Sequence, residues 1–263
     1  MTTHFTSGVT NVSSTGTSGK LKMPAPQKYH TYFNDFDTYL ASDWTITTTE
    51  GGSGNASEAL GDGDGGLLVI TNDDADNDND FLQLVKEGFK FESTKQLGFA
   101  ARMKTSDADA SDVVMGLQLT DTSPLDVTDG IFFLLTDGST TLQFIVEKDG
   151  TQSTLDLPTA MADDTFMTVG FMFDPKDQLF HVYQNNVEVG TVVSTNAPDD
   201  EELTVSFGIQ NGAAAAKAGR AGPPPLIPLQ QRLATGPHAS HLEAIKKLQR
   251  RLLLIQFNAP PKL

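Results

Sequence analysis

The chain has 263 residues, enough for one large β domain with extensions or for two small domains. It contains no cysteine, which excludes disulfides, thiolate metal ligands and a cysteine nucleophile. The net charge of −16 is unevenly spread, with +3 on residues 1–28, −26 on residues 29–212 and +7 on residues 213–263. An acidic body of this kind repels phosphate groups, so we expect no nucleic acid among its partners.

Residues 1–28 predict an extended N-terminal arm. They are rich in Thr, Ser and Gly, have no periodicity and end near Met23-Pro-Ala-Pro26. The first residues lack the basic and apolar regions of a signal peptide. No apolar run in the chain approaches the roughly 18 residues of a membrane span. We therefore expect a protein that is made in the cytoplasm, without a signal peptide and without membrane contact.

Residues 29–212 predict an all-β sandwich. Short segments rich in β-forming residues alternate with turn residues, and no segment before residue 213 has helical periodicity. The candidate strands are 29–33, 45–49, 66–71, 81–85, 96–103, 113–119, 131–136, 141–148, 151–155, 166–174, 179–184, 187–193 and 203–210. Their number and spacing favour a sandwich over an alternation of strands and helices.

The stretch from Ile131 to Val193 has the clearest strand pattern. Alternation of period two predicts two inward faces, which consist of Leu142, Phe144 and Val146 and of Met167, Val169, Phe171 and Phe173. Asp137-Gly138 and Asp149-Gly150 supply the positive φ angles that two-residue hairpin turns require. Asn185-Asn186 joins the next two strands. The predicted order is a β-meander.

Residues 213–263 predict a Pro-rich linker followed by a basic amphipathic helix. Pro223-Pro-Pro225 makes the linker stiff and extended. The helix is expected from about Ser240 to Phe257, because Ser240 and Glu243 have the spacing of a capping box and apolar residues recur at helical intervals after them.

Two parts of the sequence resemble known families. Tyr32-Phe-Asn-Asp-Phe-Asp37 with Trp44, and the meander from Phe166 to Val193, resemble concanavalin A-like jelly-roll domains over about residues 29–210. The opening Thr3–Asn11, with a sandwich behind it, resembles virion structural proteins of tailed bacteriophages. The expected fold is thus a concanavalin A-like jelly-roll β-sandwich with an extended N-terminal arm and a C-terminal Pro-rich linker plus amphipathic helix.

The segment after residue 212 departs from the jelly-roll pattern. The resemblance implies a further apolar strand after 203–210, but the chain continues with Ala, Gly, Arg and Pro. Either the closing strand comes from elsewhere, such as the N-terminal arm, or the segment from about residue 217 is not native to the domain, as after a frameshift or readthrough.

The sequence offers no catalytic residues. Glycosidases that share the jelly roll carry Glu-x-Asp-x-Glu or Glu-x-Asp-x-x-Glu on one strand, because a retaining mechanism needs two carboxylates close together. The nearest match, Glu147-Lys-Asp149, has no third carboxylate and ends in a predicted turn. We therefore expect no enzymatic activity.

The acidic run 72–80 is a candidate calcium loop, with Asp74, Asp76, Asp78 and Asp80 as ligands. An EF-hand is rejected because Phe81 occupies the position that requires Gly and strands flank the run. Two interpretations stay open: a looser calcium site between sandwich loops, also using Asp62 or Asp64, and a solvated acidic loop. No other cofactor is expected.

The functional prediction is a non-enzymatic virion protein, namely a decoration or cement protein on the capsid surface of a tailed bacteriophage. Its partners would be the major capsid protein and copies of itself, in a homo-oligomer such as a trimer. The residues predicted to bind them are Lys20, Lys22, Lys28, Lys246, Lys247, Arg250 and Arg251. The alternative is a lectin-like module that binds glycans with the help of calcium, in phage adhesion or on the phage tail.

Overall fold

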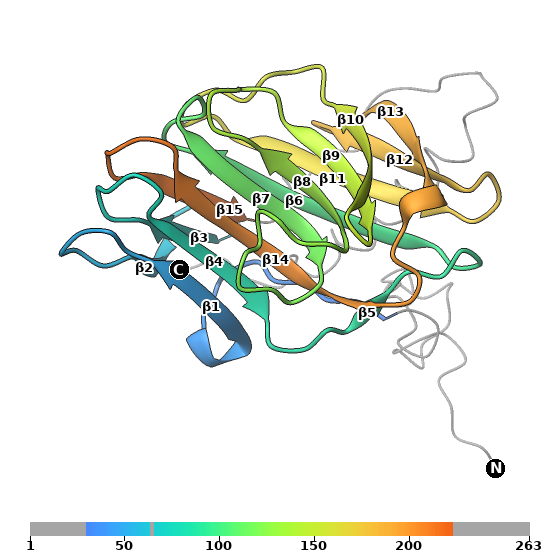
Figure 1. Cartoon of the computed structure of the whole chain (residues 1–263), viewed down its shortest axis with the longest axis horizontal. Helices are drawn as coiled ribbons and strands as arrows, with labels where there is room; N and C mark the ends of the chain where they lie inside the picture. Colours follow the sequence, from blue (N-terminus) through green and yellow to red (C-terminus); the bar gives the residue numbers. More distant parts are fainter. Residues whose placement is uncertain (1–29, 64–65, 223–263) are drawn as a thin grey trace, which may run out of the picture. The chain divides into compact units, whose positions relative to one another are not determined.

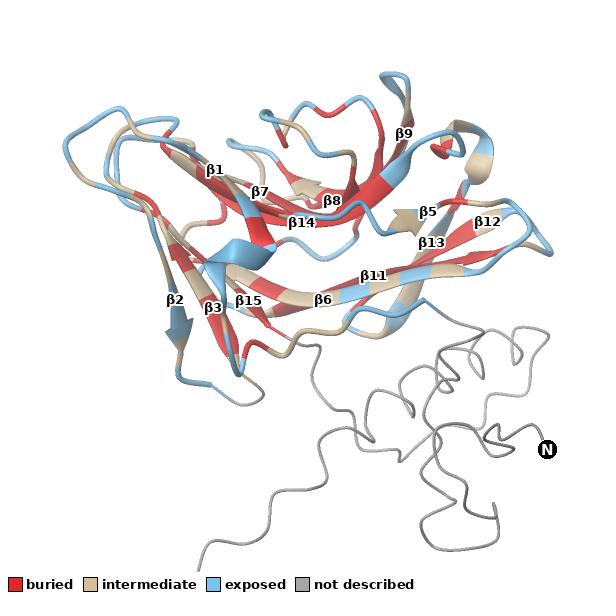
Figure 2. Cartoon of the chain, turned by 90° about the horizontal axis from the view of Figure 1, so that it is seen from below, coloured by how far each residue is buried: buried red, intermediate tan, exposed pale blue. Residues whose placement is uncertain are grey.

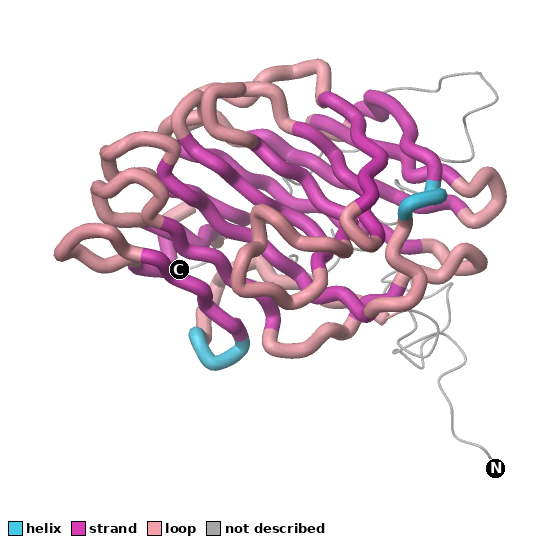
Figure 3. The backbone as a smooth tube through the Cα atoms, viewed as in Figure 1, coloured by secondary structure: helices cyan, strands magenta, loops and turns pink. Residues whose placement is uncertain are grey.

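The computed structural model describes residues 30–63 and 66–222, and the part from Asn34 onward belongs to one compact unit. Two antiparallel sheets pack face to face as a sandwich (Figure 1). In the described part the only helices are two single 3-10 turns, Ala41–Asp43 and Ser194–Asn196, drawn in cyan in Figure 3. No helix there is long and apolar enough to cross a membrane. The predicted all-β sandwich is confirmed.

The first sheet, here called sheet A, has the strand order β1-β4-β14-β7-β8-β9-β10, and β5 pairs with β14 beside this path. Figure 2 shows that sheet A is bowed, with its outer face on the concave side. Its strands are β1 (Trp44–Thr49), β4 (Asn79–Leu84), β5 (Phe89–Lys90), β7 (Ser111–Gln118), β8 (Gly130–Leu135), β9 (Gln143–Lys148), β10 (Thr151–Asp156) and β14 (Glu202–Asn211).

The second sheet, sheet B, has the order β13-β12-β11-β6-β15-β3-β2. Every strand pair in it is antiparallel. Its strands are β2 (Ser57–Gly61), β3 (Leu67–Thr71), β6 (Leu97–Thr105), β11 (Met167–Asp174), β12 (Leu179–Gln184), β13 (Val187–Val193) and β15 (Ala218–Gly222).

The main core lies between the two sheets and contains both predicted inward faces. Aromatic rings join the sheets: the ring centroid of Phe144 in sheet A lies 5.3 Å from that of Phe171 and 6.1 Å from that of Phe180 in sheet B. Such pairs contribute about 0.5–1.5 kcal/mol each beyond the burial of their area. The alternation in the sequence therefore identified the residues that hold the sandwich together.

Two of the three predicted turns have the expected geometry. Asp149 and Gly150 have φ angles of 49° and 73°, and Asn185 and Asn186 have 49° and 66°. In the pair Asp137-Gly138 only the glycine has a positive φ, 77°, and the connection from β8 to β9 spans residues 136–142. The prediction of a two-residue hairpin there is wrong, because β8 ends at Leu135 and β9 begins only at Gln143.

The sandwich continues past residue 212, which corrects the predicted boundary and the missing closing strand. The segment 218–222 forms β15 inside sheet B, where Ala218 pairs with Thr71 of β3 and Gly219 pairs with Thr105 of β6. Its small residues lack β-branched side chains, so the strand is held by its two neighbours rather than by its own propensity.

Other local predictions also differ from the structure. Residues 30–33 of the first candidate strand are not a strand, whereas β2 and β5 were not predicted. The predicted arm 1–28, the part of the linker after Gly222 and the helix from Ser240 to Phe257 lie outside the described residues.

Candidate functional site

Six loops meet at one end of the sandwich, which we call the loop end. The strand register places the starts of β4, β7 and β9 beside the ends of β1, β14, β8 and β10. Every connection that leaves or enters these strand ends therefore lies on the same side of the sheet. The loops are 50–56, 72–78, 106–110, 136–142, 157–166 and 212–217.

A row of side chains crosses the outer face of sheet A next to the loop end. Neighbouring residues such as Val113, Phe144 and Ile209 point into the core, so alternate residues point outward. We call this set the polar row; from β4 to β10 it consists of Asn79, Gln210, Asp112, Leu134, Gln143 and Asp156. All six are half-buried or exposed.

The polar side chains of the row contact one another. Asn79 Nδ2 donates to Gln210 Oε1 at 3.3 Å, and Gln210 Nε2 donates to Asp112 Oδ2 at 3.2 Å. Across Leu134, Gln143 Nε2 donates to Asp156 Oδ1 at 2.7 Å. Amides and carboxylates that are aligned in this way are preorganised to hydrogen-bond a polar ligand.

The loop end is strongly acidic. Its six loops carry ten acidic residues and one basic residue, Lys217. The acidic residues are Glu50, Asp73, Asp74, Asp76, Asp78, Asp107, Asp109, Asp137, Asp163 and Asp164. Burial raises the pKa of Asp112 in the polar row, although the backbone N–H of Asp137, 2.8 Å away, partly offsets this effect.

Few of these charges are neutralised by neighbours. Lys217 pairs with Asp107 and holds the pKa of that carboxyl below its usual range. Lys104 of β6 lies 3.0 Å from Asp164 and lowers its pKa in the same way. The polar row therefore lies in a field that attracts cations.

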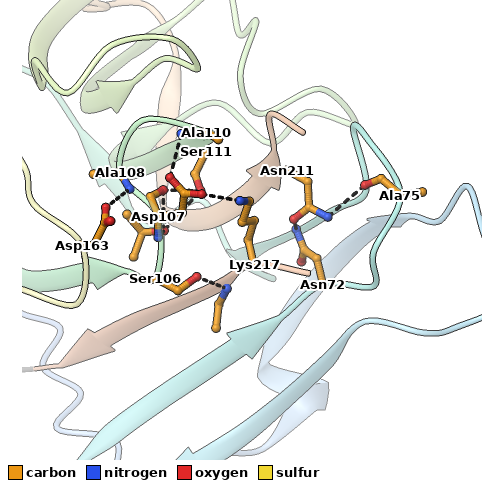
Figure 4. Close-up of polar contacts among 12 residues, drawn as sticks. Asn72, Ala75, Ser106, Asp107, Ala108, Ala110, Ser111, Asp163, Asn211 and Lys217 are labelled. Atoms are coloured by element: carbon orange, nitrogen blue, oxygen red, sulfur yellow. Dashed lines mark hydrogen bonds and ion pairs between the residues drawn. The ribbon is translucent and has the colours of Figure 1, made fainter. Parts of the chain in front are cut away.

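Polar side chains, of which Asn72, Asn211 and Lys217 are buried, join the loops to one another (Figure 4). Asn211 Nδ2 donates to the carbonyl oxygens of Asp73 and Ala75, at 2.7 and 2.9 Å. Asn72 Nδ2 donates to Asn211 Oδ1 at 3.2 Å.

A second group of contacts surrounds loop 106–110. Asp107 accepts hydrogen bonds from Lys217 and from the N–H of Ala110, and Asp163 accepts one from the N–H of Ala108. Since buried unpaired polar groups are costly, these contacts hold the loops in one arrangement.

Three carboxylates at the loop end can hold a metal ion. One oxygen each of Glu50, Asp73 and Asp78 lies within 4.8 Å of the others, and we call this set the Glu50 cluster. Burial raises the pKa of Glu50, and the charges of Asp78 and Asp73 raise it further. Glu50 Oε2 is buried without a hydrogen-bond partner. A hard cation such as Ca²⁺ prefers oxygen ligands of this kind and would relieve the repulsion.

Backbone donors position the same carboxylates. Asp78 accepts from the N–H groups of Gly51 and Ala75, and Asp73 accepts from that of Gly54 at 2.7 Å. Loops 50–56 and 72–78 are thus joined through the Glu50 cluster. At its other side, Asn77 leads into the polar row, because its side-chain oxygen lies 3.5 Å from Gln210 Nε2.

The structure does not gather the four predicted calcium ligands into one set. Asp74 and Asp76 are exposed, whereas Asp80 points between the sheets and accepts from Thr48 Oγ1 at 2.8 Å. Only Asp78 belongs to the Glu50 cluster. Sequence reasoning missed Glu50 and Asp73 because the cluster depends on the pairing of β1 with β4, and the signal available was the glycine-rich loop that begins at Glu50.

The remaining predicted site residues cannot be placed. Lys20, Lys22, Lys28, Lys246, Lys247, Arg250 and Arg251 lie outside the described residues. Of the two further acidic residues considered for calcium, Asp62 is exposed and is not in the Glu50 cluster, and Asp64 lies outside the described residues.

The other half of the outer face of sheet A is covered by loop 119–129. Val127 packs there on Phe81, Val114, Phe132 and Ile145 in a second apolar cluster. Gln83 ties the loop down, since its Nε2 donates to the carbonyl of Leu119 at 3.1 Å and its Oε1 accepts from the N–H of Asp121 at 3.0 Å.

The nearest match to a glycosidase pattern lies partly in this covered half. Glu147 is buried and accepts from Gln152 Nε2 at 3.0 Å, while Asp149 forms part of the turn between β9 and β10. Burial raises the pKa of Glu147, and the charges of Asp126 and Asp129 raise it further. The polar row therefore lies in the half of this face that loop 119–129 does not cover.

No protein-family model matches the sequence, and no curated protein matches it. Among solved structures, a native glycosidic hydrolase has a TM-score of 0.50 at 16% identity, with 74% of this chain and 96% of that chain covered. The potassium-bound carbohydrate recognition domain of Emp46p has a TM-score of 0.49 at 12% identity, with 72% and 93% covered. A protein of unknown function from Shewanella oneidensis MR-1 has a TM-score of 0.49 at 16% identity, with 86% and 100% covered. The likeness to the glycosidic hydrolase concerns the fold alone, and it agrees with the predicted jelly-roll β-sandwich.

Proposed function

We propose that this protein is a glycan-binding domain and that its binding surface is the polar row on the concave face of sheet A. The observation that carries the proposal is the alignment of two amide–carboxylate groups, Gln210 with Asp112 and Gln143 with Asp156, in one row beside a rigid loop end.

The chemistry of the row suits a sugar. Amide and carboxylate groups offer neighbouring donors and acceptors, which match adjacent hydroxyl groups on a ring. Leu134 supplies an apolar contact between the two pairs for the C–H face of a ring. Hydrogen bonds within the row already restrain these side chains, so little side-chain conformational freedom is lost on binding.

A calcium ion in the Glu50 cluster would support this surface. It would bind carboxylates from loops 50–56 and 72–78, and loop 72–78 leads directly into Asn79 of the row. Its effect on glycan binding would be to hold that end of the row in place rather than to contact the sugar.

The capsid-decoration role stays a prediction. The basic residues that carried it and the opening Thr3–Asn11 lie outside the described residues, and so does any surface they would form. Binding to a major capsid protein, assembly into a trimer and location on a virion are likewise untested, and a glycan-binding role is compatible with each of them.

A glycan array probed with and without a calcium chelator tests the proposal. We expect binding to oligosaccharides that weakens when calcium is removed. Gln143→Ala and Gln210→Ala should each reduce the affinity by about tenfold, the effect of losing one or two hydrogen bonds. Gln152→Ala is the matched control, because Gln152 lies on the same face outside the polar row. Absence of binding to every glycan, or equal losses in the control, would overturn the proposal.

A further inference from the structure

We infer that the polar row selects an extended oligosaccharide that carries protonated amino groups, such as an oligomer of glucosamine. This inference rests on the proposed function and adds to it the chemical class and the direction of the ligand.

The direction follows from the strand register. The row crosses six strands, β4, β14, β7, β8, β9 and β10, almost at right angles to them. Five spacings between neighbouring strands give a length of about 24 Å. A ligand that ran along the strands instead would meet loop 119–129 over Phe81 and Val114. The open surface thus fits a chain of several sugar rings that lies across the strands.

The charge follows from the residues of the row and its surroundings. Asp112 and Asp156 are its two ionisable members, and Asp137 of the adjoining loop lies beside Asp112. The one base in the six surrounding loops, Lys217, is 6% exposed and bound to Asp107, so it offers no charge to a ligand. The carboxylates would repel a carboxylate or sulfate on a sugar, whereas an ammonium group gains a charge-assisted hydrogen bond.

The separation of the two carboxylates requires more than one ring. Asp112 lies on β7 and Asp156 on β10, three strand spacings or about 14 Å apart. A monosaccharide with one amino group can reach only one of them. An oligomer with an amino group on every ring can satisfy both at once, and the second contact then forms at a high effective concentration.

Calorimetric titration of the full chain in a buffer that contains calcium can test the charge and the length of the ligand separately. The ligands are a glucosamine hexamer, its fully N-acetylated counterpart, a galacturonic acid hexamer and glucosamine itself. We expect the glucosamine hexamer to bind about tenfold or more tightly than the acetylated hexamer, with its advantage falling as salt is raised. The galacturonic acid hexamer and the monosaccharide should give no measurable binding.

Substitutions locate the effect. Asp112→Asn and Asp156→Asn keep the shape of the side chain and remove its charge, so each should reduce affinity for the glucosamine hexamer by about tenfold and leave the acetylated hexamer within about twofold. Asp62→Asn, which removes an exposed charge outside the site, is the matched control and should change neither. Circular dichroism on each variant establishes that it is folded.

The outcomes distinguish the inference from the proposed function. If the acetylated or the anionic hexamer binds as well as the amino hexamer, the inference is wrong and the glycan-binding function stands. If oligolysine of equal charge competes as well as the glucosamine hexamer, the surface recognises a basic peptide and the inference is again wrong. If no glycan binds at all, the proposed function itself fails.

Discussion

The outer face of sheet A has two halves that share the same strands. One half is covered by loop 119–129, and the other, which contains the polar row, is open. On β8, Phe132 lies under loop 119–129 and is 1% exposed. Leu134, two residues further on the same face, packs against the edge of this cluster but is only half-buried, and it belongs to the polar row. The covered half extends the core to the outside of the sheet, and the open half leaves its polar groups accessible to solvent. The difference shows that a strand's outward residues become core or open surface according to the loop above them.

Removing a buried side chain from the covered half should cause the greatest loss of stability. Phe132→Ala should lower the free energy of unfolding by about 3–5 kcal/mol, because it removes a buried ring and leaves a cavity under the loop. Leu134→Ala on the same face should cost less than about 1.5 kcal/mol, because Leu134 is only half-buried. Urea unfolding followed by fluorescence measures both; equal losses would mean that the two halves do not differ.

Asp80 is a buried carboxylic acid on the inner face of sheet A, and its effect on stability should depend on pH. Burial raises its pKa to about 7, and the neighbouring carboxyls of Glu58 and Glu50 act in the same direction. Because this pKa lies above the ordinary aspartate value of about 3.9 in an unfolded chain, the folded state holds the proton more tightly. Stability should therefore fall as pH rises from about 4 to 7 and then level off.

Asp80→Asn should remove that dependence and raise the free energy of unfolding above pH 7 by roughly 1–4 kcal/mol, since one pKa unit corresponds to about 1.4 kcal/mol. Denaturant unfolding at pH 5 and pH 8 gives the measurement. A variant that is less stable than the natural chain at pH 8 would show that the charged form of Asp80 is stabilising.

The smallest expected effect concerns the Glu50 cluster. Calcium at ten times its dissociation constant should stabilise the fold by about 1.4 kcal/mol, seen as a higher melting temperature that a chelator reverses. Glu50→Gln should abolish the increment, while Asp74→Asn should leave it intact. The opposite result would favour the calcium loop that the sequence alone predicted over the cluster found in the structure.

Much of the sandwich could be predicted from local pattern. Phe144 and Phe171 alternate with residues of the opposite face, and Asn185-Asn186 can adopt the positive φ angles of a tight turn. The strand at Ala218–Gly222 could not be predicted, because alanine and glycine carry no β propensity and its two partners set its conformation.

The site was less predictable than the fold for a related reason. Asn79 and Gln210 lie far apart in the chain and become neighbours only because β4 pairs with β14. Glu50 and Asp78 meet only because β1 pairs with β4. Sequence spacing carries no information on such pairing. The acidic run 72–80 could therefore be identified as a candidate site, but its partners across the sheet could not.

The place of β15 bears on how the chain is synthesised. Among the described residues this strand is the last in sequence, yet it lies between β3 and β6 in the middle of sheet B. Until it has left the ribosome, sheet B is split into two parts with two unpaired strand edges, which are templates for aggregation. Sheet B therefore cannot be completed before residues 218–222 have been synthesised, and a fragment that stops before Ala218 would lack the strand that joins its two parts.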